Sequence, residues 1–186
     1  MPVEITKLKG SAIRSNTVTN TQLASNILPT DRVLKTGDTM TGELTISAGG
    51  LNMESTTTIQ QTRERVNVAA VALSANLTVN LLDGAVTYLT SDSTANCTVN
   101  FRGNSSTTLD SVLSNGQSMT SLILVTNGAT GYVIDNVQID GASVTPKWSG
   151  NTTPTANTNA IDAFGFTIIK TATNTYTVLG SKTEFV

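Results

Sequence analysis

Residues 118–139 read SMTSLILVTNGATGYVIDNVQI, and this stretch carries the pattern that decides the fold class. Ser118–Thr126 and Tyr132–Ile139 are rich in aliphatic and β-branched residues, which favour pleated strands. Asn127-Gly128 follows the first run directly, and an Asn-Gly pair between strand-like runs is a strong hairpin signal. The stretch therefore predicts two β-strands joined by a short connection.

The same pattern extends in both directions, from Val66 to the C-terminus. Further runs of strand-like sequence are Val66–Leu73, Asn76–Leu82, Ala85–Leu89, Cys97–Phe101, Ser143–Lys147, Ala160–Lys170 and Thr173–Gly180. Turn pairs recur between them: Asp83-Gly84, Arg102-Gly103, Asn115-Gly116, Asp140-Gly141 and Ser149-Gly150. Short strands at spacings of about 8–12 residues are typical of sandwiches and jelly rolls. We therefore predict an all-β fold in which residues 66–186 form a C-terminal antiparallel β-sandwich or jelly-roll-like domain.

The first 65 residues carry much less apolar sequence. Residues 1–35 follow neither a helical nor a strand period and cannot bury enough surface to order themselves, which predicts an extended arm held by other chains. Residues 36–65 hold one turn and a short alternating strand around Leu44 and Ile46. A unit of that size is unstable alone, so its apolar residues are expected to pack against copies of themselves around a symmetry axis.

Composition excludes several classes of function. The 186 residues include 34 Thr, 17 Ser and 17 Asn, 11 Lys+Arg against 13 Asp+Glu, one Cys and no His. Without His there is no Ser-His-Asp or Cys-His couple and no imidazole metal ligand, and one Cys allows neither an internal disulfide nor a CxxC site. The low charge argues against nucleic-acid binding, and no apolar run reaches the roughly 20 residues of a membrane span. We expect no enzyme, no catalytic residues, no metal, no cofactor and no membrane insertion.

Two stretches carry a resemblance to known proteins. Gly37–Leu44, GDTMTGEL, resembles the short G-D-T-M-T-G-x-L motif of tail fibres and related virion proteins of bacteriophages. Residues from about Gly116 to Val186 resemble the C-terminal domain of fibre-like structural proteins of marine cyanophages, and Asn16–Leu28 is similar to their Thr/Asn-rich leader. The landmarks of the C-terminal resemblance are LVTNGATGY at 124–132, QIDG at 138–141, VTPKW at 144–148, FTIIKT at 166–171 and YTVL at 176–179.

The resemblance implies a trimeric structural protein of the phage particle, located at its tail or head surface. Residues 1–35 would be a virion-anchoring arm that contacts other tail or capsid proteins, with Val18, Leu23, Ile27 and Leu28 as docking residues. Residues 36–65 would be the trimerisation or shaft segment, with Gly37, Asp38, Thr39, Met40, Thr41, Gly42, Leu44 and Ile46 as its motif residues. One motif copy without repeats favours a short tail-fibre-like appendage or fibre adaptor over a long fibre.

Two other functions stay open. The chain could be a capsid decoration or head-fibre protein, which has the same architecture and a different anchor. It could also be an adhesin for a host surface glycan, with Trp148, the only Trp, as a stacking platform; the competing interpretation is that Trp148 packs beneath the loop after it. An acidic or aromatic groove around Trp148 and residues 151–159 would favour the adhesin.

Other candidate residues receive ordinary structural interpretations. Asp135, Asp140 and Asp162 match the spacing of no calcium loop. Asp38 and Glu43 lie on one short turn, which gives neither the separation nor the groove of a glycosidase carboxylate pair. Cys97 lacks a His partner and is expected to be a structural thiol. Arg63-Glu64-Arg65 is expected on a solvated face or in an inter-subunit salt bridge.

Overall fold

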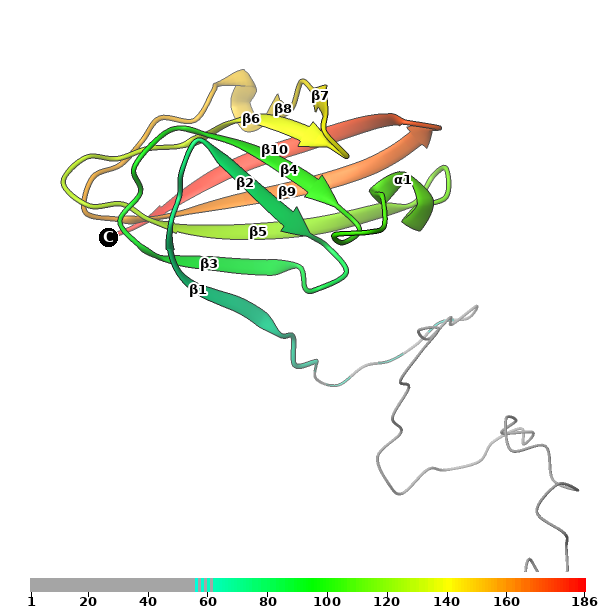
Figure 1. The fold of residues 1–186 in the computed structure, drawn as a ribbon, viewed down its shortest axis with the longest axis horizontal. Helices are drawn as coiled ribbons and strands as arrows, with labels where there is room; N and C mark the ends of the chain where they lie inside the picture. The colour runs from blue at the N-terminus through cyan, green and yellow to red at the C-terminus, as the bar shows by residue number, and fades with distance from the viewer. Residues whose placement is uncertain (1–55, 57, 59, 61) are drawn as a thin grey trace, which may run out of the picture. The chain divides into compact units, whose positions relative to one another are not determined.

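The computed structural model describes residues 56, 58, 60 and 62–186 (Figure 1). The chain divides into two units, Met1–Thr58 and Ile59–Val186, and the second holds every helix and strand named below. The arm predicted for residues 1–35 and the docking residues predicted within it lie outside the described residues. The motif residues between Gly37 and Ile46 lie outside them as well.

The prediction of an all-β fold built from two sheets is confirmed. A six-stranded sheet has the order β1-β3-β5-β9-β10-β8, and a four-stranded sheet has the order β2-β4-β6-β7. The strands are β1 (Val66–Ala72), β2 (Asn76–Asn80), β3 (Val86–Ser91), β4 (Cys97–Arg102), β5 (Ser118–Thr126), β6 (Ile134–Ile139), β7 (Ala142–Val144), β8 (Lys147–Trp148), β9 (Ile161–Ala172) and β10 (Thr175–Phe185). A short helix, α1 (Leu109–Val112), and a 3₁₀ turn at Ser149–Asn151 complete the described elements.

The prediction that the sandwich is antiparallel is wrong for its first half. The chain crosses from one sheet to the other after each of the first five strands, so β1, β3 and β5 pair in parallel, and so do β2, β4 and β6 (Figure 1). Antiparallel pairing is confined to β5 with β9, β9 with β10, and β6 with β7. The first six strands of the domain thus alternate between two sheets, and the antiparallel β9–β10 hairpin then extends the larger sheet.

Asn127-Gly128 does not form a hairpin, because the Asn127 side chain is buried in hydrogen bonds and Gly128 lies close against Asp92. Asn127 is buried; its Oδ1 accepts from the backbone N–H of Tyr132 at 3.1 Å and its Nδ2 donates to Asp162 Oδ2 at 3.1 Å. A Cβ at position 128 would overlap the carboxylate of Asp92. The pair therefore lets β5 leave the six-stranded sheet and β6 enter the other.

One predicted turn pair does form a two-residue hairpin. Ile139 pairs with Ala142 across Asp140-Gly141, joining β6 to β7. Asp140 has φ 52° and Gly141 has φ 85°, the left-handed values that a type I′ turn requires at both central positions.

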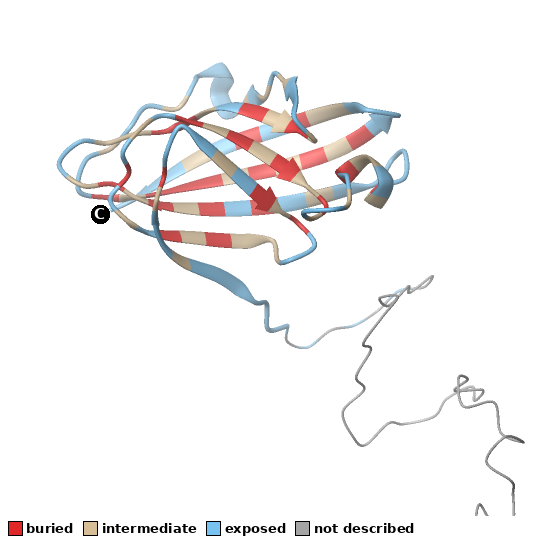
Figure 2. Ribbon diagram, in the orientation of Figure 1, coloured by how far each residue is buried: buried red, intermediate tan, exposed pale blue. Residues whose placement is uncertain are grey.

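The core lies between the two sheets, where β3, β4, β5, β6 and β9 bury alternate residues (Figure 2). Phe101 of β4 meets Phe166 of β9 edge to face, with ring centroids 5.2 Å apart. The predicted strand Ser143–Lys147 is instead split between the two sheets: β7 ends at Val144 and β8 begins at Lys147. Pro146 lies at the break, where its missing N–H cannot continue a ladder.

Candidate functional site

On the outer face of the six-stranded sheet, which points away from the core, apolar residues gather across the first three strands, where solvent would favour polar residues. We call the outward positions of β1, β3, β5, β9 and β10 the outer face. The strand register places two adjacent rows of apolar and aromatic residues across its first three strands: Val66, Val86 and Leu122 in one row, and Val68, Tyr88 and Leu124 in the next. Sheets with one solvated face normally alternate apolar and polar residues, so this face differs from a surface built for water.

Across β1, β3 and β5 the outer face carries no charged side chain; the charged residues beside it are Lys147 of β8, which pairs with Leu179, and Glu64, and both line the groove described below. β1, β3 and β5 contain no charged residue. The charged residues of β9 and β10 alternate onto the opposite side of the sheet, where Phe164 pairs with Lys182 and Asp162 with Glu184. The apolar rows of β1, β3 and β5 therefore hold no charge that would favour their contact with water.

Several side chains of the outer face are well exposed within one chain. Val68 is 63% exposed and Leu122 is 37% exposed. Gly165 places no side chain in the row beyond Leu122, and a groove of about 740 Å³ crosses the face there. The face is thus contoured and open, as a contact surface would be.

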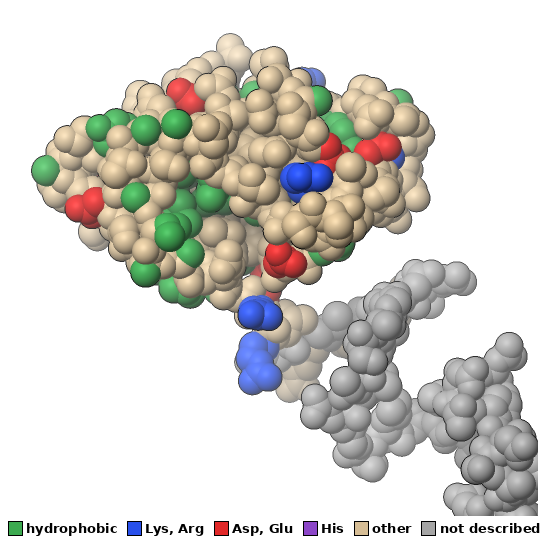
Figure 3. Space-filling model, viewed as in Figure 1, with side chains coloured by type: hydrophobic (Ala, Val, Ile, Leu, Met, Phe, Trp, Pro, Cys, Tyr) green, Lys and Arg blue, Asp and Glu red, His purple; other side chains and the backbone are tan. Residues whose placement is uncertain are grey.

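The outer face of the four-stranded sheet has the opposite character. Two of its outward rows consist of amides and hydroxyls: Asn76, Thr98 and Asn136 in one, and Thr78, Asn100, Gln138 and Ser143 in the next; the row after these pairs Asn80 with Arg102. Figure 3 views the molecule from this side, and most of what it shows is neither charged nor hydrophobic. The polar side chains of this face suit contact with water. The exposed apolar rows are therefore a feature of the six-stranded sheet alone among the two.

Trp148 lies at the edge of the core rather than on an open platform. Its ring meets Phe166 edge to face with centroids 5.8 Å apart, and it is only partly exposed. A Cβ at position 180 would come within 2.5 Å of Trp148 Cζ3, so the indole occupies the space that Gly180 leaves. Its position favours the packing interpretation, in which the indole closes one edge of the sandwich.

A second groove, of about 880 Å³, runs beside Trp148 along the outer side of β6 and β7. Amide, hydroxyl and carboxylate side chains dominate its walls: Thr98, Asp135, Asn136, Gln138, Ser143, Thr145, Asn151 and Thr153. A groove of this size with several converging polar groups can hold a small polar ligand.

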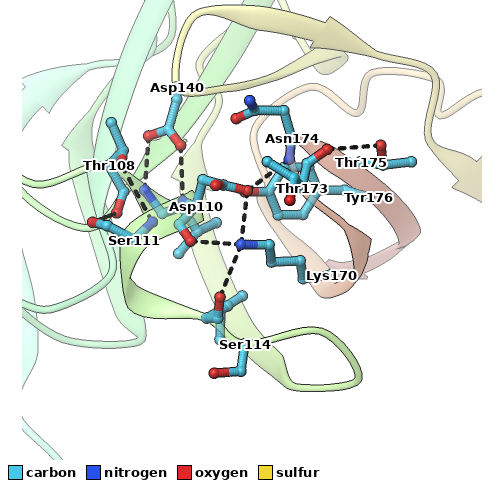
Figure 4. A network of polar contacts seen from close by, with 12 residues as sticks. Thr108, Asp110, Ser111, Ser114, Asp140, Lys170, Thr173, Asn174, Thr175 and Tyr176 are labelled. Carbon is cyan, nitrogen blue, oxygen red and sulfur yellow. Dashed lines mark hydrogen bonds and ion pairs between the residues drawn. The ribbon is translucent and has the colours of Figure 1, made fainter.

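A cluster of polar contacts clamps α1 to the β9–β10 hairpin (Figure 4). Lys170 Nζ lies 2.8 Å from Asp110 Oδ1 and also donates to the carbonyl oxygens of Asp110 and Leu113. Asp110 Oδ1 accepts in addition from the backbone N–H of Asn174 at 2.7 Å and from the hydroxyl of Tyr176 at 3.1 Å. Each group of the cluster satisfies another, which makes it a structural clamp.

The contacts within the clamp shift the pKa values of Asp110 and Tyr176. The hydrogen bond from Lys170 holds the pKa of the Asp110 carboxyl below its usual range, and the backbone N–H of Asn174 adds to this effect. Burial raises the pKa of the Tyr176 hydroxyl well above its usual range, and its hydrogen bond to Asp110 raises it further. The clamp therefore holds an ionised Asp110 and a protonated Tyr176 at neutral pH.

A second buried ion pair lies near the opposite end of β9. Asp162 is fully buried, and its Oδ1 lies 3.1 Å from Lys182 Nζ. Nδ2 of Asn157 donates to the same oxygen at 2.8 Å. The carboxylate is thus paired and hydrogen-bonded, as a buried charge must be.

The other candidate residues are dispersed. Asp140 accepts from the backbone N–H groups of Leu109 and Asp110, far from the Asp162 pair along the chain. Among the described residues no three His, Cys, Asp or Glu side chains gather as a metal site would need. Cys97 is buried, and burial, with the charge of Asp135, raises its thiol pKa to about 12. Arg63, Glu64 and Arg65 are all exposed; Asp38 and Glu43 lie outside the described residues.

Sequence reasoning missed the outer face, although the chain carries a signal for it. Leu122-Ile123-Leu124-Val125 is an unbroken apolar run rather than an alternating one. Such a run is typical of a strand that is covered on both sides. The clamp could not be found in the same way, since Asp110 and Lys170 are brought together only by the fold.

Comparisons of the chain with protein-family models, with curated proteins and with solved structures gave no match. In the part of the chain that the structure describes, none of the helices has the length and apolar character needed to cross a membrane.

Proposed function

We propose that the chain is a structural component of a phage virion, a short trimeric tail-fibre-like appendage or fibre adaptor that attaches through residues 1–35. In this proposal residues 36–65 form the trimer contact and residues 66–186 form the projecting β domain. The activity is mechanical: symmetric packing between copies buries the apolar residues that residues 36–65 cannot bury within one chain.

The observation that carries the proposal is the difference between the two outer faces of the sandwich. The amide and hydroxyl rows on β2, β4 and β6 suit a surface that stays in water, whereas the apolar rows across β1, β3 and β5 suit a surface that another protein covers. A domain with one polar face and one face that exposes apolar rows is expected to pack into an assembly through the apolar rows. The motif at Gly37–Leu44 supports the choice of a phage particle as that assembly.

The test is to look for the chain in virus particles. Particles purified from the source of the sequence would be analysed by mass spectrometry and labelled with antibodies to residues 66–186 under the electron microscope. The proposal expects the chain in the particle and label on the tail. Label on the head would instead support the capsid decoration or head-fibre protein. Absence of the chain from purified particles would overturn both.

A second candidate function, binding of a host surface glycan, is favoured by the groove beside Trp148. Asp135, Asn136 and Gln138 offer a carboxylate and two amides along one wall, and paired polar groups of this kind recognise the hydroxyls of a sugar. Because Trp148 packs on Phe166 and Gly180, its loss would disturb the sandwich edge as well as the groove. Trp148→Ala is therefore a poor test of glycan binding.

Polar substitutions in the groove give a cleaner test. Asp135→Ala and Gln138→Ala remove groove-lining side chains on β6, and Thr78→Ala removes a polar side chain from the same sheet outside the groove. On a glycan array, the adhesin function expects binding that the first two variants lose and Thr78→Ala keeps. An array on which the wild-type chain binds nothing contradicts it.

A further inference from the structure

We propose that the apolar rows across β1, β3 and β5 are the surface on which the β domain packs against a second copy of this chain. The contact rests on the proposed function, since it supplies a second interface for the multimer beyond residues 36–65. It names the part of the domain that the copies share and leaves the four-stranded sheet facing water.

The first argument is the exposure of these side chains. Val66, Val68 and Leu122 are 43%, 63% and 37% exposed, and the register sets them in two neighbouring rows with Val86, Tyr88 and Leu124. Burying an apolar side chain stabilises a contact by roughly 25 cal/mol per Å² removed from water. Adjacent rows of such residues are a patch of the kind that marks a protein contact.

The second argument concerns which protein covers the patch. Side chains that line the axis of a symmetric trimer meet the same side chains of the other copies, so a charge in the rows would meet like charges there. β1, β3 and β5 contain no charged residue. The charged residues of β9 and β10 lie on the core side of the sheet. The rows themselves are therefore free of charge and can pack against their own copies, while Glu64 and Lys147 lie beside them at the groove.

The third argument is where the rest of the chain joins the domain. Residues 1–65 connect at Val66, which is the first residue of β1 and the corner of the apolar rows. Segments that hold copies together ahead of this point therefore bring the β1 strands of those copies near one another. The surface closest to the junction is the one that meets a second copy first.

Contour supplies a fourth argument. The groove of about 740 Å³ crosses the face at Gly165; Val86, Leu122 and Leu179 border it, and Glu64 and Lys147 also line it. Exposed side chains such as Val68 can enter a groove of this size on a facing copy. Interlocking of protruding and recessed positions is what close packing at an interface requires.

Hydroxyl-radical footprinting of the full-length chain tests the contact. Tyr88 lies in the apolar rows and Tyr132 lies in the loop between β5 and β6, and both side chains are partly exposed within one chain. If copies pack through the rows, Tyr88 should be oxidised several-fold more slowly than Tyr132. Val68→Glu should remove this protection, because it buries like charges at the contact.

Two further variants keep the test decisive. Leu122→Glu should also expose Tyr88 to oxidation. Thr78→Glu, on the polar face of the other sheet, should leave Tyr88 protected. Circular dichroism checks that each variant keeps its β structure. A wild-type Tyr88 as reactive as Tyr132 overturns the contact. This holds even if the chain sediments as a trimer, and the proposed virion function would then remain.

Other occupants of the face give distinct results. Tyr88 that is reactive in the purified chain and protected only in intact particles would show that a different virion protein covers the rows, which overturns the self-contact. Tyr88 protected in the purified chain, together with absence of the chain from particles, would uphold the contact and overturn the virion function. The two proposals therefore fail separately.

Discussion

At the scale of single residues, the packing of Trp148 depends on the absence of a side chain at Gly180. The indole ring fills the space that a side chain at 180 would take, and it meets Phe166 at 5.8 Å. Sequence alone left two interpretations of Trp148, because an isolated Trp near a Pro can pack or can bind. The deciding fact is a contact with a glycine 32 positions away, which local pattern does not encode.

Gly180→Ala is expected to displace Trp148. The added Cβ would lie 2.5 Å from Cζ3 of the indole, and overpacking of this kind costs about 1–3 kcal/mol of unfolding free energy. Since Trp148 is the only Trp, its fluorescence reports the change directly, as a red shift. Gly165→Ala is the matched control: its Cβ points to the outer face, 3.1 Å from Ser181 Oγ, and should leave the emission where it is. Identical spectra for the two variants would contradict this role of Gly180.

The clamp predicts a pH dependence of stability. Lys170 lowers the pKa of Asp110 in the folded chain, so the folded state holds fewer protons there than the unfolded state does. The stabilisation is present above the pKa of an unfolded aspartate, about 3.9, and is lost as the pH falls through the lower folded value.

Urea unfolding from neutral pH to about pH 2 measures this effect. Asp110→Asn should be less stable than wild type at neutral pH and should lose part of the decline in acid. Asp135→Asn, which changes a carboxylate outside the clamp, should keep the full decline. An unchanged acid profile for Asp110→Asn would show that the clamp does not stabilise the fold.

At the scale of elements, the strands were predictable and their pairing was not. Local sequence placed Ser118–Thr126 without error and most other strands within a few residues, because the alternation of side chains is a local property. Parallel or antiparallel pairing depends on where the chain goes after each strand. Asn127-Gly128 has the composition of a hairpin, but burial of the Asn127 side chain and the close approach of Gly128 to Asp92 settle its geometry.

Asp140 links two elements, and its substitution should loosen both. Its backbone has φ 52° in the β6–β7 turn, and its carboxylate accepts from the N–H groups of Leu109 and Asp110 at 2.9 and 3.1 Å. Asp140→Ala is expected to cost about 1–2 kcal/mol, the usual range for losing such an acceptor at the start of a helix.

Amide hydrogen exchange locates the effect. Exchange at Leu109 and Asp110 should accelerate in Asp140→Ala and recover in part in Asp140→Asn, because Asn tolerates a positive φ and keeps one acceptor oxygen. Equal exchange rates in wild type and Asp140→Ala would contradict the link between the turn and α1.

At the scale of the whole molecule, the sandwich separates two chemistries onto two faces. Sequence composition pointed to a polar β protein that completes its core with neighbours, but it placed that need in residues 1–65. The structure adds a second candidate surface inside residues 66–186, where Leu122 and Leu124 extend from the core strand β5 to its outer side. Composition could not locate it, because a face exists only once the strands are in register.

The central claim is that this chain works as a multimer of itself. Sedimentation equilibrium of the full-length chain measures that claim most directly. We predict a mass of three times the 19.4 kDa of one chain, holding on dilution through the micromolar range. A single species at 19.4 kDa over the same range would contradict it.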